Sequence, residues 1–169
     1  MEEELIELGS PTASKRVILL HGLTGTASVI RPVAEYLCKR LGEDYSFLLP
    51  TAPIIKVKQF NGEPAHAWFD VKSSDFRREA DIDGIFESSD RIASLVRNEI
   101  SQGVSPKDIY LGGFSQGGVI ALTTALLEPF AVAGVFAFSS FWSIKEIFEQ
   151  EKRVQKGWFP KNPKRTYKF

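Results

Sequence analysis

Short apolar runs recur along the chain and are separated by longer amphipathic segments. The runs lie at residues 5–8, 17–20, 47–49, 109–111 and 132–138. A strand that is covered on both faces of a parallel sheet is continuously apolar, whereas a half-exposed strand alternates apolar and polar side chains. We therefore expect these five runs to be strands, most of them in one parallel sheet.

Helical periodicity fills the intervals between the runs. Apolar residues recur at helical spacing over residues 30–41 and 82–100, and a third helix is expected over 119–127. The first helix should be capped near Ser28 and end at Gly42. Its apolar stripe would comprise Ile30, Val33, Ala34, Leu37, Cys38 and Leu41. Strands that alternate with helices predict an α/β fold, with helices on both faces of a mostly parallel sheet.

Two stretches do not follow this alternation. Residues 54–70 contain Pro, Gly and Asn without steady periodicity, so we expect a long functional loop there. Ser143 and Glu146 form a capping-box pattern, which predicts a short amphipathic helix before a basic tail. Residues 1–142 hold 13 Lys and Arg against 18 Asp and Glu, whereas residues 143–169 hold 8 against 3. The chain is therefore expected to consist of a domain over 1–142 and a divergent tail over 143–169.

Composition narrows the partners and the compartment. The 21 basic and 21 acidic residues balance, so we expect no nucleic acid and at most transient membrane contact. The single cysteine, Cys38, excludes an internal disulfide and fits a reducing compartment, where it would be a small core residue. Residues 1–4 lack the basic and apolar regions of a signal peptide, and no apolar run approaches the roughly 20 residues that span a bilayer. These features favour a cytoplasmic protein, and none of them indicates an oligomeric state.

A glycine-rich run carries the clearest chemical signal. Residues 112–118 read Gly-Gly-Phe-Ser-Gln-Gly-Gly and lie between a predicted strand and a predicted helix. A sharp strand-to-helix turn exposes a serine nucleophile only where the flanking side chains are minimal, as Gly113 and Gly117 are beside Ser115. The N–H groups that open the helix face any negative charge at the serine, so the Gln116 N–H is a candidate oxyanion donor. The alternative is a glycine-rich turn with an incidental serine.

The loop after the strand at 17–20 is expected to supply a second oxyanion donor. In strand-turn-helix hydrolases that donor comes from the loop after an earlier strand, and Leu23 follows His21 and Gly22 there. The loop glycines lack the full Gly-x-Gly-x-x-Gly pattern of a dinucleotide site. We therefore expect no cofactor, and no metal is implied.

Four linked motifs resemble those of the acyl-protein thioesterase/carboxylesterase family of the α/β-hydrolase superfamily. They are VILLHGL at 17–23, PTAP at 50–53, AWFD at 67–70 and LGGFSQGG at 111–118, in the family's order. The resemblance covers roughly residues 5–142 and implies an α/β-hydrolase fold. It also implies hydrolysis of thioesters on S-acylated (palmitoylated) proteins, of short carboxylic esters or of lysophospholipids. Such an activity would give the protein a role in lipid metabolism.

The resemblance assigns roles to individual residues. Ser115 matches the family's nucleophile, while Leu23 and Gln116 match its oxyanion donors. Trp68 matches a tryptophan near the acyl channel, for which a half-buried core aromatic is the alternative reading. One departure lies in the oxyanion loop, where Thr24 and Gly25 replace the family's usual Gly-Asp.

The family's remaining triad residues have no counterpart. The triad Asp and His should follow the serine along the chain, yet both histidines, His21 and His66, precede Ser115 and no Asp follows Asp108. His21 is expected to pack its loop, and His66 to lie in surface or loop packing. We interpret the chain as a thioesterase-like serine hydrolase truncated after about residue 142, without the C-terminal strands that carry Asp and His.

That interpretation raises three questions, about the activity of the chain, the role of its tail and the covering of its last strand. The chain could retain some hydrolase activity, act as a non-catalytic acyl-binding protein or truncated isoform, or be an inert fragment. The basic tail could anchor the chain to an anionic lipid or partner, or be a substitute C-terminus. The strand at 132–138 would become an apolar edge, which the helix from Ser143 would cover.

Overall fold

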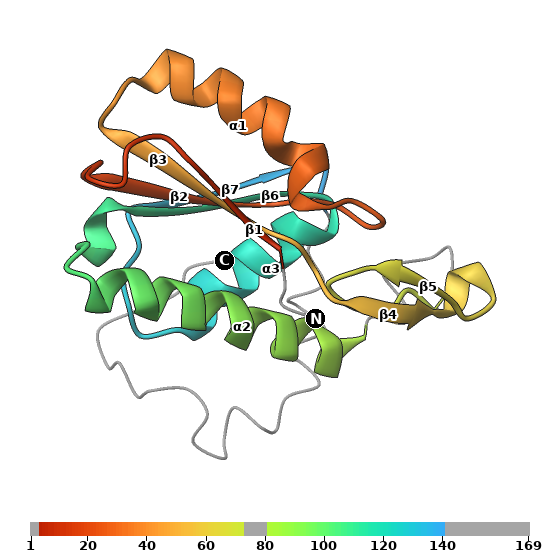
Figure 1. Ribbon diagram of the computed structural model, residues 1–169. Coiled ribbons are helices and arrows are strands. Elements are labelled where there is room, and N and C mark those ends of the chain that lie inside the picture. Colours follow the sequence, from red (N-terminus) through yellow and green to blue (C-terminus); the bar gives the residue numbers. More distant parts are fainter. Residues whose placement is uncertain (1–3, 73–80, 141–169) are drawn as a thin grey trace.

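The five apolar runs lie side by side in one sheet of the computed structural model, which describes residues 4–72 and 81–140 (Figure 1). The strands are β1 (Leu5–Leu8), β2 (Lys15–Leu20), β3 (Tyr45–Pro50), β6 (Ile109–Phe114) and β7 (Gly134–Phe138). Their spatial order is β1-β3-β2-β6-β7. The pair β1–β3 is antiparallel and the other three pairs are parallel. The predicted mostly parallel sheet is confirmed.

Helices cover both faces of this sheet. Helix α1 (Ala27–Leu41) packs on one face, while α2 (Ile82–Ser101) and α3 (Gln116–Leu127) pack on the other (Figure 1). Alternate residues of β2 divide between the two layers. Val17 and Leu19 belong to the cluster under α1, and Ile18 and Leu20 to the cluster under α2 and α3. Two covered faces explain why β2 reads as an unbroken apolar run.

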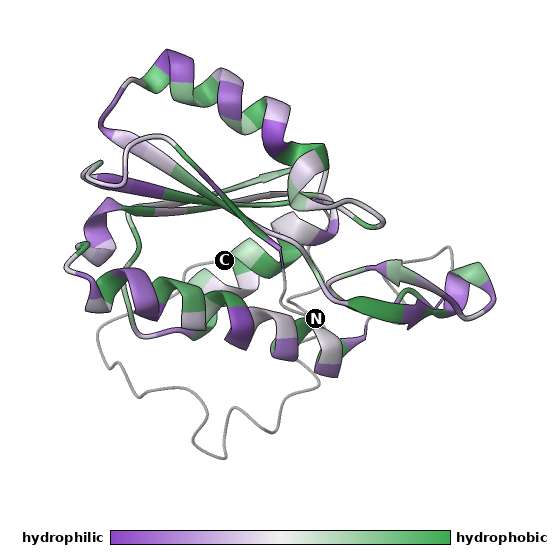
Figure 2. Cartoon of the chain, in the orientation of Figure 1, coloured by the Kyte–Doolittle hydropathy of each residue, from purple (hydrophilic) through white to green (hydrophobic). Residues whose placement is uncertain are grey.

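Burial in these two clusters supplies much of the driving force for the fold. Ile18, Leu20 and Ile109 are each 0% exposed. Burying one such side chain contributes roughly 1.5–3 kcal/mol. Figure 2 shows hydrophobic residues along the central strands and alternating hydrophilic and hydrophobic residues along α1 and α2.

Helix α1 differs from its prediction at both its start and its stripe. It begins at Ala27 after Thr26, rather than being capped near Ser28, and the Thr26 side chain makes no capping hydrogen bond. Val33 and Leu41, predicted on the buried stripe, are 49% and 44% exposed. Successive helical residues are about 100° apart, so Val33 points well away from buried Ala34. The stripe that meets the sheet is narrower than the apolar pattern indicated.

The prediction of a long loop over residues 54–70 was wrong in part. The segment contains an antiparallel hairpin of β4 (Ile54–Val57) and β5 (Glu63–His66) with a short 3-10 turn, Lys58–Phe60, between them. Asn61 and Gly62 close the turn with φ of 56° and 83°. This hairpin depends on pairing between its two strands, and Pro64 within β5 masked the strand pattern.

The carboxyl-terminal part of the described chain also differs from its prediction. Helix α3 starts at Gln116, three residues before the expected start at 119, and β7 starts at Gly134 rather than at 132. Within residues 4–72 and 81–140, β7 is an edge strand with Phe138 60% exposed. The predicted helix from Ser143, its covering role and the basic tail lie outside the described residues.

Candidate active site

Ser115 occupies a sharp turn between β6 and α3. Its backbone adopts φ 52° and ψ −118°, a region that a non-glycine residue enters at a cost of roughly 1–3 kcal/mol. The surrounding structure fixes this conformation from both sides. The Ser115 N–H donates to the Phe138 carbonyl at 2.9 Å, and the Ser140 hydroxyl donates to the Ser115 carbonyl at 2.7 Å. The serine is half-buried at the carboxyl end of the sheet.

The two glycines that flank Ser115 allow this turn to pack. A Cβ on Gly113 would collide with the backbone of Gly117. A Cβ on Gly117 would lie 2.5 Å from the carbonyl oxygens of both Leu20 and His21. Real Cβ atoms do not approach backbone this closely, so only glycine fits at either position. The Gly-x-Ser-x-Gly spacing therefore has a direct steric cause.

The loop that carries Leu23 lies against the serine turn. A Cβ on Gly22 would lie 3.4 Å from the Ser115 Cβ and 3.0 Å from the Phe114 ring. Gln116, the other expected donor, opens α3 directly after Ser115. The structure thus brings Ser115 and the loops of both candidate donors together. Their roles as nucleophile and oxyanion donors stay predictions.

The Gln116 side chain has a function that the sequence did not indicate. Its Oε1 accepts a hydrogen bond from the Trp68 backbone N–H at 3.1 Å, and its Nε2 donates to the Phe69 carbonyl at 2.9 Å. The amide thereby pairs with two backbone groups of another segment, as a neighbouring strand would. No pattern of residue spacing signals such a contact, because the partners are 47–48 positions apart.

Trp68 is a core aromatic. It is 2% exposed, so it is more completely buried than the half-buried ring considered from the sequence. Its indole N–H donates to the His21 carbonyl at 2.8 Å, and the Trp68 and His21 rings lie 5.1 Å apart. Trp68 also borders a cavity of about 460 Å³ together with Pro53, Ile55 and Arg91. A part in acyl binding stays a prediction.

His21 is held inside the protein by both ring nitrogens. It is 1% exposed, its Nε2 accepts from the Ala52 N–H at 2.9 Å, and its Nδ1 lies 2.7 Å from the Gly22 carbonyl. The acceptor role of Nε2 assigns the proton to Nδ1, which donates to Gly22. Burial lowers the pKa of His21, opposed by the Gly22 carbonyl and assisted by nearby His66. The expected loop-packing role is confirmed.

His66 makes a similar structural contact. Its Nδ1 lies 2.7 Å from the Ala52 carbonyl, and its own carbonyl accepts from the Thr24 N–H at 2.8 Å. It is half-buried at the end of β5. Both histidines of the chain therefore serve the packing of the loops around Ser115.

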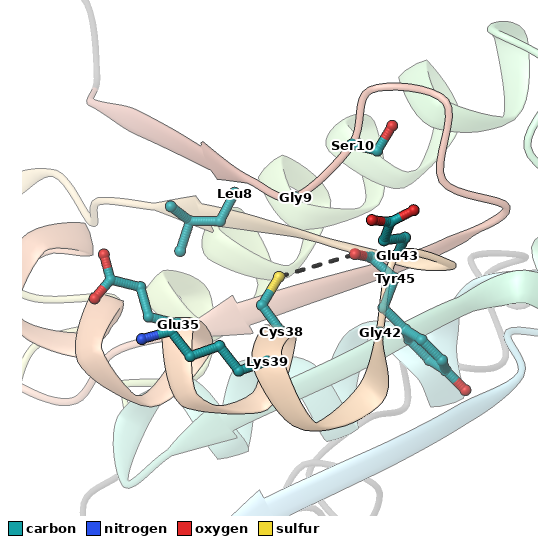
Figure 3. Close-up of a pocket in the computed structure, with 9 residues that line it drawn as sticks. All are labelled: Leu8, Gly9, Ser10, Glu35, Cys38, Lys39, Gly42, Glu43 and Tyr45. Carbon is teal, nitrogen blue, oxygen red and sulfur yellow. Dashed lines mark hydrogen bonds between the residues drawn. The ribbon is translucent and has the colours of Figure 1, made fainter.

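A second hollow lies away from this region, between α1 and the turn after β1 (Figure 3). It measures about 610 Å³, and none of the predicted site residues lines it. Cys38 points its thiol toward the Tyr45 carbonyl there, and burial raises the pKa of that thiol. A raised pKa keeps the thiol protonated, which agrees with the core role expected for Cys38.

Two further features concern metals and membranes. Within residues 4–72 and 81–140, no group of three or more His, Cys, Asp or Glu side chains is arranged to hold a metal ion. The helices in the same residues are too short or too polar to cross a membrane.

Comparison with known proteins finds consistent matches in one family. The family model described as phospholipase/carboxylesterase matches residues 1–158, which includes the first sixteen residues of the predicted tail. Acyl-protein thioesterase 1 of Saccharomyces cerevisiae is 37% identical over 145 residues, covering 83% of this chain and 63% of the yeast protein. Acyl-protein thioesterase 1 homolog 2 of Dictyostelium discoideum is 34% identical over 139 residues, covering 81% of this chain and 63% of that protein. The chain thus spans less than two thirds of the length of these relatives.

Solved structures give the same result. SOBER1 of Arabidopsis thaliana superimposes with a TM-score of 0.75 at 25% identity, covering 90% of this chain and 70% of SOBER1. Acyl-protein thioesterase 2 of Zea mays, with a TM-score of 0.68 and 22% identity, shares the fold. The α/β-hydrolase architecture expected from the four motifs is confirmed.

Proposed function

This chain belongs to the phospholipase/carboxylesterase family, and we propose that it is an acyl-protein thioesterase-like serine hydrolase with Ser115 as its nucleophile. Its substrates would be acyl thioesters on proteins, short carboxylic esters or lysophospholipids. The proposal rests on one observation above all. Ser115 is held at φ 52° between β6 and α3, with flanking glycines at which no Cβ fits.

The chemistry follows from that arrangement. The Ser115 Oγ attacks the thioester carbonyl carbon, its proton passes to a base, and the thiol leaves to give an acyl-enzyme that water hydrolyses. Negative charge on the carbonyl oxygen would be stabilised by the N–H groups of Leu23 and Gln116, and the N-terminus of α3 adds its dipole. Losing one such donor typically costs about 3 kcal/mol of transition-state stabilisation.

The histidines of this chain are poorly placed to accept the proton of Ser115. Both ring nitrogens of His21 are engaged, by Ala52 and Gly22, and the Nδ1 of His66 is engaged by the Ala52 carbonyl. A serine hydrolase that lacks triad members retains roughly 10³–10⁴-fold acceleration over water from its oxyanion hole and binding. We expect turnover of this chain to lie within that range.

A fluorophosphonate probe and a palmitoyl-thioester assay test the proposal. Wild-type protein should be labelled, and Ser115→Ala should lose the labelling together with the part of the turnover that passes through the acyl-enzyme. Ser94→Ala, at an exposed serine of α2, is the matched control and should behave as wild type. Labelling that survives in Ser115→Ala would refute the nucleophile assignment.

The engaged histidines favour a second candidate, an acyl-binding protein without turnover. Such a protein would bind a palmitoyl ligand equally well as wild type and as Ser115→Ala, with no thioester cleavage in either. Turnover that depends on Ser115 would exclude it.

A further inference from the structure

Two backbone groups that flank Leu23 in the sequence are hydrogen-bonded to the same distant segment of the chain. On one side of it, the His21 carbonyl accepts a hydrogen bond from the Trp68 indole N–H at 2.8 Å. On the other side, the Thr24 N–H donates to the His66 carbonyl at 2.8 Å. Both partners come from the three-residue stretch 66–68, which begins at the last residue of β5. The peptide groups immediately before and immediately after the one that carries the Leu23 N–H are therefore both held by hydrogen bonds.

The loop that carries Leu23 has few internal contacts that could fix its backbone conformation. Within residues 21–26 it contains two glycines, and its internal backbone hydrogen bond runs from the Gly25 N–H to the Gly22 carbonyl at 3.0 Å. Thr24 adopts φ 63°, a left-handed conformation that a β-branched residue rarely takes. A strained residue keeps such a conformation only where its surroundings impose it. The hydrogen bond from the Thr24 N–H to the His66 carbonyl acts on this residue directly, and the Trp68 bond acts on the same loop at the His21 carbonyl.

The same stretch also reaches the other candidate donor. The Gln116 side chain pairs with the Trp68 N–H and the Phe69 carbonyl, and Gln116 directly follows Ser115. Trp68 is thus bonded to the Leu23 loop by its indole and to the start of α3 by its backbone. The Ser88 hydroxyl, from α2, donates to the Trp68 carbonyl and ties the same residue to the helix behind it.

We infer that Trp68 is a positioning residue of the oxyanion hole, which sets the spacing between the Leu23 and Gln116 N–H groups. It acts through the His21 carbonyl and the Gln116 amide, from a buried place at which it is only 2% exposed. The effect of Trp68 on catalysis rests on the proposed function. Its anchoring of the Leu23 loop does not depend on that function. Small misplacements matter, since a shift of about 1 Å in a catalytic group can cost on the order of 100-fold in rate.

Trp68→Phe tests this, because it keeps a buried aromatic ring and removes the N–H that holds the His21 carbonyl, together with part of the ring volume. Ile85→Val, a buried residue of α2 in the same core cluster, is the control for general loss of packing. Amide hydrogen exchange at Gly22, Leu23 and Thr24 is compared with exchange in β2. Trp68→Phe should accelerate exchange in the loop by about 10- to 100-fold, as expected for one lost buried hydrogen bond, and leave β2 within the range of the control.

The rate of fluorophosphonate labelling provides the second measurement. In Trp68→Phe the maximal rate of labelling at saturating probe should fall by at least about tenfold, with the half-saturating probe concentration little changed. A purely structural role would lower the stability of Trp68→Phe and Ile85→Val alike, with equal labelling rates at equal folded fraction. Loop exchange and labelling rates that match the control would overturn the inference.

A second variant covers a failure of Trp68→Phe to fold. Gln116→Met keeps the backbone N–H and approximate side-chain volume but removes both hydrogen bonds to residues 68–69, so it should lower the maximal labelling rate in the same way. Absence of any labelling in wild-type protein would count against Ser115 as nucleophile, and the exchange measurement would still decide whether Trp68 anchors the loop.

Discussion

At the scale of single residues, strain is concentrated around the site. Among the described non-glycine residues, those with positive φ are Thr24, Asn61, Ser115 and Ser139. Asn61 sits in a tight turn that tolerates the left-handed region. Thr24 and Ser115 belong to the two loops that meet at the candidate oxyanion hole. Thr24 therefore occupies a left-handed position in this loop without glycine, the residue that suits such a position best.

Thr24→Gly should relieve that strain. The left-handed conformation costs an L-residue about 1–2 kcal/mol, partly offset by the greater freedom of glycine in the unfolded chain. We expect the free energy of unfolding to rise by about 0.5–1 kcal/mol, measured by urea denaturation. Thr26→Gly is the control, since Thr26 has an extended φ of −142° and no side-chain cap to lose. A loss of stability in Thr24→Gly larger than that in Thr26→Gly would contradict the strain assignment.

At the scale of elements, the site depends on how closely β6 and α3 approach β2. The first turn of α3 lies against the carbonyl groups of Leu20 and His21, where the hydrogen atom of Gly117 is the largest substituent that fits. This contact sets the direction in which α3 leaves the serine turn. The direction in turn decides where the Gln116 N–H points.

Gly117→Ala should therefore damage both stability and reactivity. The added methyl meets backbone rather than a flexible side chain, so overpacking should lower the free energy of unfolding by about 1–3 kcal/mol. Labelling of Ser115 should drop at least tenfold in the folded protein. Gly134→Ala in β7 is the matched control, because its Cβ would meet the Tyr110 ring at an ordinary 3.4 Å. Equal effects of the two substitutions would exclude the steric explanation.

At the scale of the whole molecule, three loops meet at the carboxyl ends of the parallel strands. The loop after β2 carries His21 and Leu23, the segment after β3 carries Ala52, and the turn after β6 carries Ser115. Ligands of open α/β sheets bind at this edge. The His21 ring connects the first two loops because it accepts a hydrogen bond from the Ala52 N–H. The protonation state of His21 therefore affects the stability of the whole fold.

Stability should consequently fall in mild acid. Burial lowers the pKa of His21 below its ordinary value of about 6.5. The unfolded chain takes up a proton at His21 as the pH falls through about 6.5, whereas the folded chain resists it, so the contribution is complete above that pH and declines below it. Between pH 7 and pH 5.5 the free energy of unfolding should fall by up to about 1 kcal/mol.

His21→Gln provides the comparison, because its amide can still accept from the Ala52 N–H but cannot titrate. Urea denaturation at both pH values should show that this variant lacks the His21 part of the decline. An identical pH dependence in wild type and variant would mean that His21 is not the titrating group.

Much of this protein is determined locally in its sequence. The apolar runs that become β2 and β6 are continuous because both of their faces are buried, and that requirement is visible without coordinates. The serine turn is local in part. Glycine at 113 is required by the backbone of Gly117 four positions later, whereas glycine at 117 is required by the carbonyl groups of Leu20 and His21 on a distant strand and its loop.

What only the tertiary structure decided involves partners far apart in the chain. The β4–β5 hairpin, the exposure of Val33, and the anchoring of Leu23 by Trp68 and His66 arise from contacts that no local periodicity encodes. The Gly-x-Ser-x-Gly pattern indicates a nucleophile, because the residues that form the turn are adjacent in the sequence even though distant groups hold it. The geometry of an oxyanion hole depends on segments that the sheet brings together, because hydrogen bonds form between atoms that are close in space whatever their separation along the chain.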